Sequence, residues 1–383
     1  NVNLSDGQYD EEYLDSYVLS GDVTGNGVDD IIRVSNVKVS MGYEYTLKTY
    51  IQVCRASVQN GEIEYDSPIV YKTIGSISTE FRKCLVRGTV FGDLDGDGIK
   101  DIIIPIFHED GFAYLTFNAI FGKDIIIGNT NDIYGTRYIP CESGTPLINL
   151  TDFNRDGKVE ILYLHKQESN GTYLCLLLAN ENGLVYTYPF NFSLSSTPQK
   201  IYTSDFNHDG LIDLMVISES GYRIFYNQGG TSLQNIFVNN SSLNTNVTDH
   251  DHLEPGDFNG DGILDFIWND ENSSQLYFEI GNANGTFTRR QAYNLPFAIN
   301  YKNIDEGTWN CVVTDLDHDG KSDVVLSVAQ YTYYGFPGLH YHQTHTYWLL
   351  SDGSSLTKKK EATSAREDDA KAGRLFVGDF KGN

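Results

Sequence analysis

Acidic side chains recur along the chain in a short loop with fixed spacing. In one copy, DLDGDGIKD, the residues Asp93, Asp95, Asp97 and Asp101 place carboxylate oxygens at positions one, three, five and nine. Calcium binds six to eight oxygen ligands in flexible geometry, and a backbone carbonyl at position seven can supply another. Gly98 at position six lets the chain turn sharply around an ion. The spacing therefore predicts a calcium-binding loop.

Four further copies keep the same frame, with Asp or Asn at position three. Their predicted ligands are Asp152, Asn154, Asp156 and Glu160; Asp205, Asn207, Asp209 and Asp213; Asp257, Asn259, Asp261 and Asp265; and Asp315, Asp317, Asp319 and Asp323. Asp, Asn and Gly also form ordinary turns, but turn preference does not explain an acid at position nine in every copy. About five Ca²⁺ sites are expected, and Mg²⁺ is disfavoured because a cage of many protein oxygens suits the larger ion.

Two more copies, nearest the ends of the chain, are degenerate. The first has Asp22, Thr24, Asn26 and Asp30, with only two carboxylates, and the last has Asp379 followed by Lys381 at position three. We expect no metal at either.

The loop is part of a longer repeat, whose copies begin near residues 22, 93, 152, 205, 257, 315 and 379. An apolar strand precedes and follows each loop, and Asn182-Gly183, Asn284-Gly285 and Asp352-Gly353 are typical of tight hairpin turns. Four-stranded units of this kind bury both faces by stacking radially. The sequence predicts an all-β fold, a β-propeller of four-stranded antiparallel blades in one domain over residues 1–383. Seven blades are favoured, with six as the alternative, and only 361–373 offers a short exposed turn of helix.

The composition disfavours several classes of binding partner. The formal net charge is −25, from 27 basic and 52 acidic residues, which disfavours nucleic acid and anionic lipid surfaces and favours a monomer. No stretch approaches the roughly 20 apolar residues of a membrane span, and the first residues do not read as a signal peptide. The five cysteines have no CxxC spacing, so a zinc or disulfide framework is not expected, although Cys54 and Cys84 could pair.

Evidence for catalysis in the sequence is weak. His340, His342 and His345 lie in an aromatic segment, 331–347, where two of them would share a strand face and could bind zinc. An aromatic insertion is the favoured interpretation, and Asp249–His252 is interpreted as a polar loop. There is no nucleophile elbow or phosphate loop, while paired carboxylates for glycoside chemistry stay open.

The copies GDLDGDGIKDIIIP and GDFNGDGILDFIWN resemble the FG-GAP/VCBS repeats of integrin α-subunit propellers and of many secreted bacterial proteins. That resemblance implies calcium in the loops and a role in recognition or adhesion. The segment RLFVGDFKGN also resembles repeats of bacterial Rhs and toxin-complex B proteins of the SpvB type, which implies a module of a larger secreted or surface protein.

We therefore expect a calcium-stabilised extracellular recognition propeller that binds a protein or glycan through loops on one face. Insertions near 36–80 and 331–346 are the expected ligand-facing variation. The alternative is a propeller enzyme, a hydrolase or lyase acting on glycans in the central channel, because the fold alone does not decide function.

Overall fold

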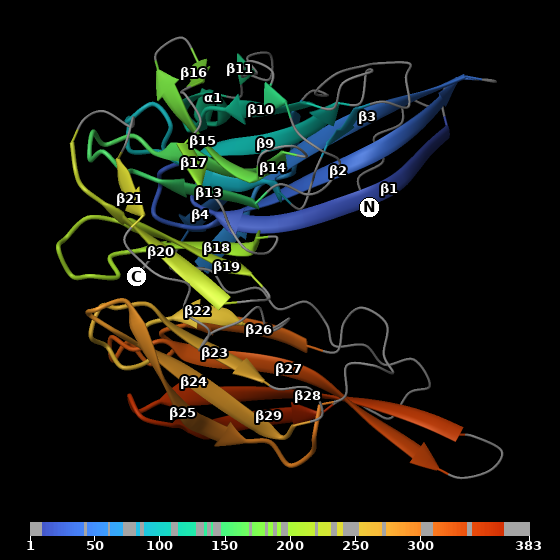
Figure 1. The fold of residues 1–383 in the computed structure, drawn as a ribbon. Helices are drawn as coiled ribbons and strands as arrows, with labels where there is room; N and C mark the ends of the chain where they lie inside the picture. The colour runs from blue at the N-terminus through green and yellow to red at the C-terminus, as the bar shows by residue number, and fades with distance from the viewer. Residues whose placement is uncertain are drawn as a thin grey trace. The chain divides into compact units, whose positions relative to one another are not determined.

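The structure is a computed structural model (Figure 1). It describes residues 10–41, 44–59, 62–71, 82–84, 88–108, 114–127, 134–135, 139–140, 147–167, 171–180, 183–186, 190–192, 198–218, 221–230, 236–239, 253–269, 273–299, 309–334 and 339–363. In these ranges strands form six antiparallel sheets and one separate hairpin. The chain divides into two compact units, the first with the three sheets before residue 198 and the second with the three that follow.

The first unit holds three sheets and the separate β4–β5 hairpin. The first sheet has the order β1-β2-β3-β6, the second β11-β10-β9-β7 with β8 on β9 and β12 on β10, and the third β13-β14-β15-β16 with β17 on β15. The strands are β1 Asp10–Gly21, β2 Asp30–Met41, β3 Glu44–Cys54, β4 Ala56–Gln59, β5 Glu62–Tyr65, β6 Ile69–Tyr71, β7 Arg82–Cys84, β8 Val90–Gly92, β9 Asp101–His108, β10 Tyr114–Ile120, β11 Tyr134–Gly135, β12 Ile139–Pro140, β13 Leu147–Thr151, β14 Glu160–Gln167, β15 Gly171–Asn180, β16 Gly183–Tyr186 and β17 Phe190–Phe192. Helix α1, Gly122–Ile127, follows β10.

The second unit holds three four-stranded sheets, each in plain sequential order. Its strands are β18 Pro198–Ser204, β19 Asp213–Ser218, β20 Gly221–Asn227, β21 Phe237–Asn239, β22 Glu254–Gly256, β23 Asp265–Asn269, β24 Gln275–Asn282, β25 Thr286–Asn294, β26 Trp309–Thr314, β27 Asp323–Tyr334, β28 Leu339–Ser351 and β29 Leu356–Thr363. Each of these sheets is the predicted unit of four antiparallel strands.

Every described acidic loop joins two paired strands of a sheet in the same register. The residue before position one pairs with the ninth residue, as Gly256 does with Asp265 and Thr314 with Asp323. The ninth residue is therefore the first residue of the following strand. Position nine belongs to the sheet as well as to the loop, which ties the geometry of any site to the strands.

The strands after the second and fifth loops, β9 and β23, are apolar on both faces because sheets of their own unit pack against both of them. On β9, Ile102 and Ile104 join the core with the first sheet, while Ile103 joins the core with the third. On β23, Phe266 packs with the fourth sheet and Ile267 with the sixth. Within each unit, consecutive sheets therefore stack face to face, as the blades of a propeller do.

The fold class is confirmed as all-β with antiparallel sheets of the propeller type. The predicted turn at Asn284-Gly285 joins β24 to β25, the one at Asp352-Gly353 joins β28 to β29, and both glycines have positive φ. Helix α1 is a difference, because the sequence shows no helical period there. Within 361–373, residues 361–363 end β29, and the rest lies outside the described residues.

The structure also bears on the predicted cysteine pair and on the seventh repeat. Cys54 is a free thiol, so the suggested pair with Cys84 is not formed. The seventh signature, Asp379 with Lys381, lies outside the described residues. The choice between seven and six blades therefore stays a prediction.

Truncating a core ring should test this packing. Phe278 is fully buried and stacks on Phe258 with ring centroids 4.7 Å apart. We expect Phe278→Ala to lower the free energy of unfolding by about 3–5 kcal/mol, measured by urea denaturation. Val58→Ala removes methyl groups from a side chain that is 51% exposed, so it should change stability by only about 0.5 kcal/mol. Equal effects of the two variants would contradict the packing described here.

Candidate metal centre

All six described loops share one backbone conformation. Position six is always glycine, with φ between 82° and 87°. Position four is also left-handed in every copy, and three of these residues are not glycine: Arg155, His208 and His318, with φ of 59° to 62°. Such a conformation is uncommon for residues with a side chain. The turn at position six is visible in the sequence as a constant glycine, whereas position four gives no such signal because its residue type varies.

Loop carboxylates at positions one and five cap the turn. Asp257 accepts hydrogen bonds from the backbone N–H of Asp261 at 3.1 Å and of Gly262 at 2.8 Å. Asp261 in turn accepts from the N–H of Ile263 at 2.8 Å. The other five loops repeat these three bonds at 2.7 to 3.1 Å, with the amide oxygen of Asn26 as the position-five acceptor in the first loop. The side-chain oxygens thus gather on the inside of the turn, where a cation would sit.

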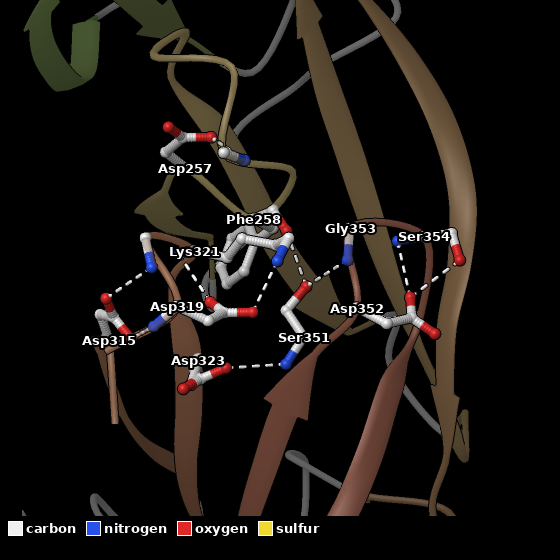
Figure 2. Close-up of polar contacts among 12 residues, drawn as sticks. Asp257, Phe258, Asp315, Asp319, Lys321, Asp323, Ser351, Asp352, Gly353 and Ser354 are labelled. Atoms are coloured by element: carbon white, nitrogen blue, oxygen red, sulfur yellow. Dashed lines mark hydrogen bonds and ion pairs between the residues drawn. The ribbon is translucent and has the colours of Figure 1, made fainter. Parts of the chain in front are cut away.

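The ninth-position acid is fully buried in every described copy. One of its oxygens accepts from the backbone N–H of position two, at 2.7 to 3.0 Å. In five copies the other oxygen accepts from the N–H of a residue that lies within two positions of the end of the third strand. Figure 2 shows this bond for Asp323, whose Oδ1 lies 2.7 Å from the nitrogen of Ser351. The matching pairs are Asp30 with Ala56, Asp101 with Gly122, Asp213 with Asn227 and Asp265 with Gly281, at 2.7 to 2.8 Å.

We call this pair of bonds the carboxylate bridge. Gly281 shows how close the bridge draws the third strand to the loop. A Cβ on Gly281 would lie 2.5 Å from the carbonyl oxygen of Leu264, closer than atoms that are not hydrogen-bonded can approach. The sequence spacing predicts position nine as a metal ligand and gives no sign of its backbone partners. A carboxylate has enough lone pairs to accept the two backbone hydrogen bonds and also to bind a metal ion.

The third loop departs from this pattern at one atom. Glu160 has the bond from Phe153 on Oε2, at 2.7 Å, but its Oε1 is buried without a hydrogen-bond partner. Ligand oxygens of Asp152, Asp156 and Glu160 all lie within 4.8 Å of one another. A buried carboxylate oxygen without a donor is costly. An oxygen set with one unpaired atom is chemically suited to a hard cation such as Ca²⁺.

Two other loops gather three acids within the same distance. They are Asp93, Asp95 and Asp101 in the second loop and Asp315, Asp317 and Asp323 in the sixth. Among the described residues the fourth and fifth loops bring no three acids so close, and they have Asn207 and Asn259 at position three. The structure therefore brings together three of the four predicted ligands in each of two loops, the second and the sixth, and three of four in the third. The remaining predicted ligands of these loops are Asp97, Asp319 and Asn154, which lie in the same turns.

Comparison with known families supplies the name of the repeat. The FG-GAP-like repeat matches residues 152–216, 205–268 and 257–326. Residues 152–326 consist of FG-GAP-like repeats. This stretch is a little under half of the chain and includes the third to sixth acidic loops. The first two described sheets share their loop geometry with these repeats, which agrees with the family predicted from the sequence.

Two solved structures are similar to this chain. One is an Agrocybe aegerita lectin that recognises non-reducing terminal N-acetylglucosamine, with 16% identity, a TM-score of 0.50 and coverage of 93% of this chain and 86% of the lectin. The other is the Photorhabdus luminescens Tc holotoxin pore, with 14% identity, a TM-score of 0.39 and coverage of 89% of this chain and 16% of that one. The lectin likeness concerns the fold alone. Curated protein sequences gave no match.

Neighbouring repeats contact each other through their acidic loops. The N–H at position eight of one loop donates to the position-one carbonyl of the loop before it, as Ser322 does to Asp257 at 2.7 Å and Val159 to Asp93 at 2.8 Å. Figure 2 shows a second link, where the Ser351 hydroxyl donates to the carbonyl of Phe258 at 2.7 Å. In these two pairs, the loops of adjacent sheets form one hydrogen-bonded edge.

The first loop keeps the frame of an FG-GAP-like repeat without its ligand set. Asn26, at position five, donates from Nδ2 to the carbonyl of Ala56 at 2.7 Å. Asp30 accepts from the N–H of the same residue. Ala56 begins the β4–β5 hairpin, so the degenerate loop holds the base of this hairpin. The expectation of no metal at this loop stays a prediction.

Histidines outside the repeats were the other candidate site. His340 and His342 lie on β28, but their side chains are outside the described residues, as are Asp249–His252. The ring of His345 lies 3.3 Å from Glu361 and stacks near Tyr347. His345 is therefore part of a side-chain cluster on β28 and β29. Within the described ranges, no helix has the length and hydropathy of a membrane span.

Burial dominates the electrostatics of the ninth-position acids. It raises the pKa of Asp101, Asp213 and Asp265 to about 7 and that of Glu160 to about 8, against the lowering effect of the backbone donors. Neighbouring loop carboxylates raise these pKa values further. Without a cation the loops therefore favour protons at position nine near neutral pH.

This shift predicts how stability depends on pH when no divalent cation is present. The folded pKa values lie above those of the unfolded chain, so the folded state binds more protons and loses stability as pH rises from about 4 to about 8. We expect the melting temperature in EDTA to fall between pH 5 and 8, and saturating calcium to remove the decline. Asp213→Asn should flatten the slope in EDTA. Asp352→Asn should leave it unchanged, because the Asp352 pKa is about 2. A melting temperature that rises with pH in EDTA would contradict this account.

Proposed function

We propose that residues 1–383 form a calcium-stabilised recognition propeller, a monomeric module of a larger secreted or surface protein of bacterial origin. The proposed ligands of about five Ca²⁺ ions are those named for the five complete loops. The observation that carries the calcium assignment is the unpartnered Oε1 of Glu160 beside Asp152 and Asp156. Calcium would supply the positive charge that offsets the crowded carboxylates, and the chain would supply oxygens already oriented by the turn.

Recognition is supported by the parts of the chain that depart from the repeat. The β4–β5 hairpin is not part of any four-stranded sheet. An ion pair between Arg55 and Asp66 at 3.3 Å closes its base. Its side chains Val58 and Tyr65 are 51% and 39% exposed. An ordered hairpin with an exposed aromatic ring is suited to ligand contact, so we assign recognition to this end of the first sheet.

A glycan is the first ligand class to test, since the lectin with a similar fold recognises a sugar. A protein partner is the second. The likeness to that lectin concerns the fold, so the sugar itself is open. The long hairpins β2–β3 and β27–β28 extend from the opposite ends of their sheets, away from the acidic loops, and offer a second surface.

Removal of calcium should lower stability. A cation at 100 times its dissociation constant stabilises the folded state by about 2.7 kcal/mol per site. We expect EGTA to lower the melting temperature of the full chain, and Glu160→Gln to weaken one calcium site by about tenfold or more in calorimetric titration. Glu64→Gln, on the exposed hairpin, is the matched control and should bind calcium as the wild type does. Identical melting curves with and without EGTA would refute the calcium proposal.

Recognition should depend on the exposed ring of the hairpin. We expect the calcium-loaded chain to bind members of a glycan array, and Tyr65→Ala to reduce that binding by about tenfold, because an aromatic contact is worth on the order of 1 kcal/mol or more. Leu14→Ala removes another exposed apolar side chain, outside the hairpin, and should bind as the wild type does. Unchanged binding by Tyr65→Ala would exclude this hairpin as the contact surface.

A further inference from the structure

The two loops with four carboxylates each hold a lysine ammonium. In the second loop, Nζ of Lys123 forms an ion pair with Asp95. In the sixth loop, Nζ of Lys321 lies 2.5 Å from Asp319. Asp95 and Asp319 are both among the proposed calcium ligands, at positions three and five. A fixed positive charge therefore lies against each of the most acidic loops.

The three loops with three carboxylates carry a neutral amide instead. Asn154, Asn207 and Asn259 at position three donate from Nδ2 to the position-five carboxylate, at 3.2, 2.9 and 2.9 Å. Counting the four ligand positions and the paired lysine, all five complete loops then have the same net charge. An additional carboxylate at position three is thus accompanied by an ammonium group from the chain itself.

Lys123 is placed by an element outside its loop. It is the second residue of α1, and the N–H of Gly122 before it donates to Asp101 at 2.8 Å. Its Nζ lies 4.8 Å from the ring centroid of Phe121. The Asp95 side chain is only 9% exposed, whereas that of Lys123 is 53% exposed. The carboxylate bridge of the second sheet therefore also holds the lysine over its loop, with room to swing into solvent.

We propose that Lys123 and Lys321 are internal counter-ions that compete with the divalent cation for the second and sixth loops. This inference rests on the proposed calcium function. Two positive charges a few ångströms apart repel each other, so calcium entry requires the ammonium group to leave its carboxylate. The lysine then has two opposite effects. It stabilises the empty loop by offsetting repulsion between carboxylates, and it lowers the affinity of that loop for calcium.

Calorimetric calcium titration of the full chain tests this in a double-mutant cycle. We expect Lys123→Met to tighten calcium binding at one site roughly two- to fivefold, the range for a partly exposed ion pair. The same variant should melt at a lower temperature in EDTA. The gain in affinity should vanish when Asp93→Asn removes the second loop as a site, with Asp97→Asn as a second variant for the same purpose.

Lys100→Met is the matched control, because it removes the same charge from the exposed position eight of the same loop. It should change calcium affinity less than Lys123→Met does. Lys321→Met with Asp315→Asn repeats the cycle at the sixth loop. Loss of a merely structural ion pair would lower the stability of the fold and leave calcium affinity unchanged. Tighter calcium binding together with lower stability in EDTA therefore distinguishes a counter-ion from a structural ion pair.

The outcomes separate this inference from the function on which it rests. If Asp93→Asn loses a calcium site while Lys123→Met binds as the wild type does, the counter-ion role is refuted and calcium binding stands. If neither the wild type nor Lys123→Met binds calcium at a site that depends on Asp93, both are refuted for this loop. A site that forms only in Lys123→Met supports the competition in its strongest form.

Discussion

In five of the six described repeats, the carboxylate bridge is the contact on which the rest of the repeat depends. A single buried side chain, such as Asp265, bonds the second residue of its loop and the end of the third strand. The second residue is itself a core side chain, since Phe258 is fully buried. Loop, core and strand position are therefore fixed by one carboxyl group. Its burial is unfavourable for a charge, and the two backbone donors together with a proton or a cation nearby offset that cost.

The hydrogen-bond frame and the ligand set are separable features of the loop. The first loop keeps the turn and the bridge of Asp30, yet uses Asn26 to hold a hairpin. The second loop keeps the same frame and adds Lys123. The side chains that could bind a metal therefore vary over a constant backbone. One repeat can thus offer a candidate cation site in one sheet and support an inserted hairpin in another.

Much of the repeat could be read from the sequence, because its determinants are local. The loop motif covers nine residues, the apolar strand follows it directly, and the hairpin turn at Asn284-Gly285 is determined by two adjacent residues. What could not be read depends on partners farther along the chain. The donor to Asp323 is 28 residues away, at Ser351, and that to Asp101 is Gly122, 21 residues away. The apolar residue at position two, such as Phe206 or Phe258, is a sequence signal for the bond between position two and position nine. The spacing of the acidic residues alone does not include it.

The short sequence separation of the carboxylate bridge has a consequence for how the chain acquires its fold. Every bridge joins residues no more than 28 positions apart, so a sheet can close before the next repeat has left the ribosome. Contacts this local favour rapid folding. Within each unit, a finished sheet then presents an apolar face on which the following sheet assembles, so that each unit is built in order along the chain.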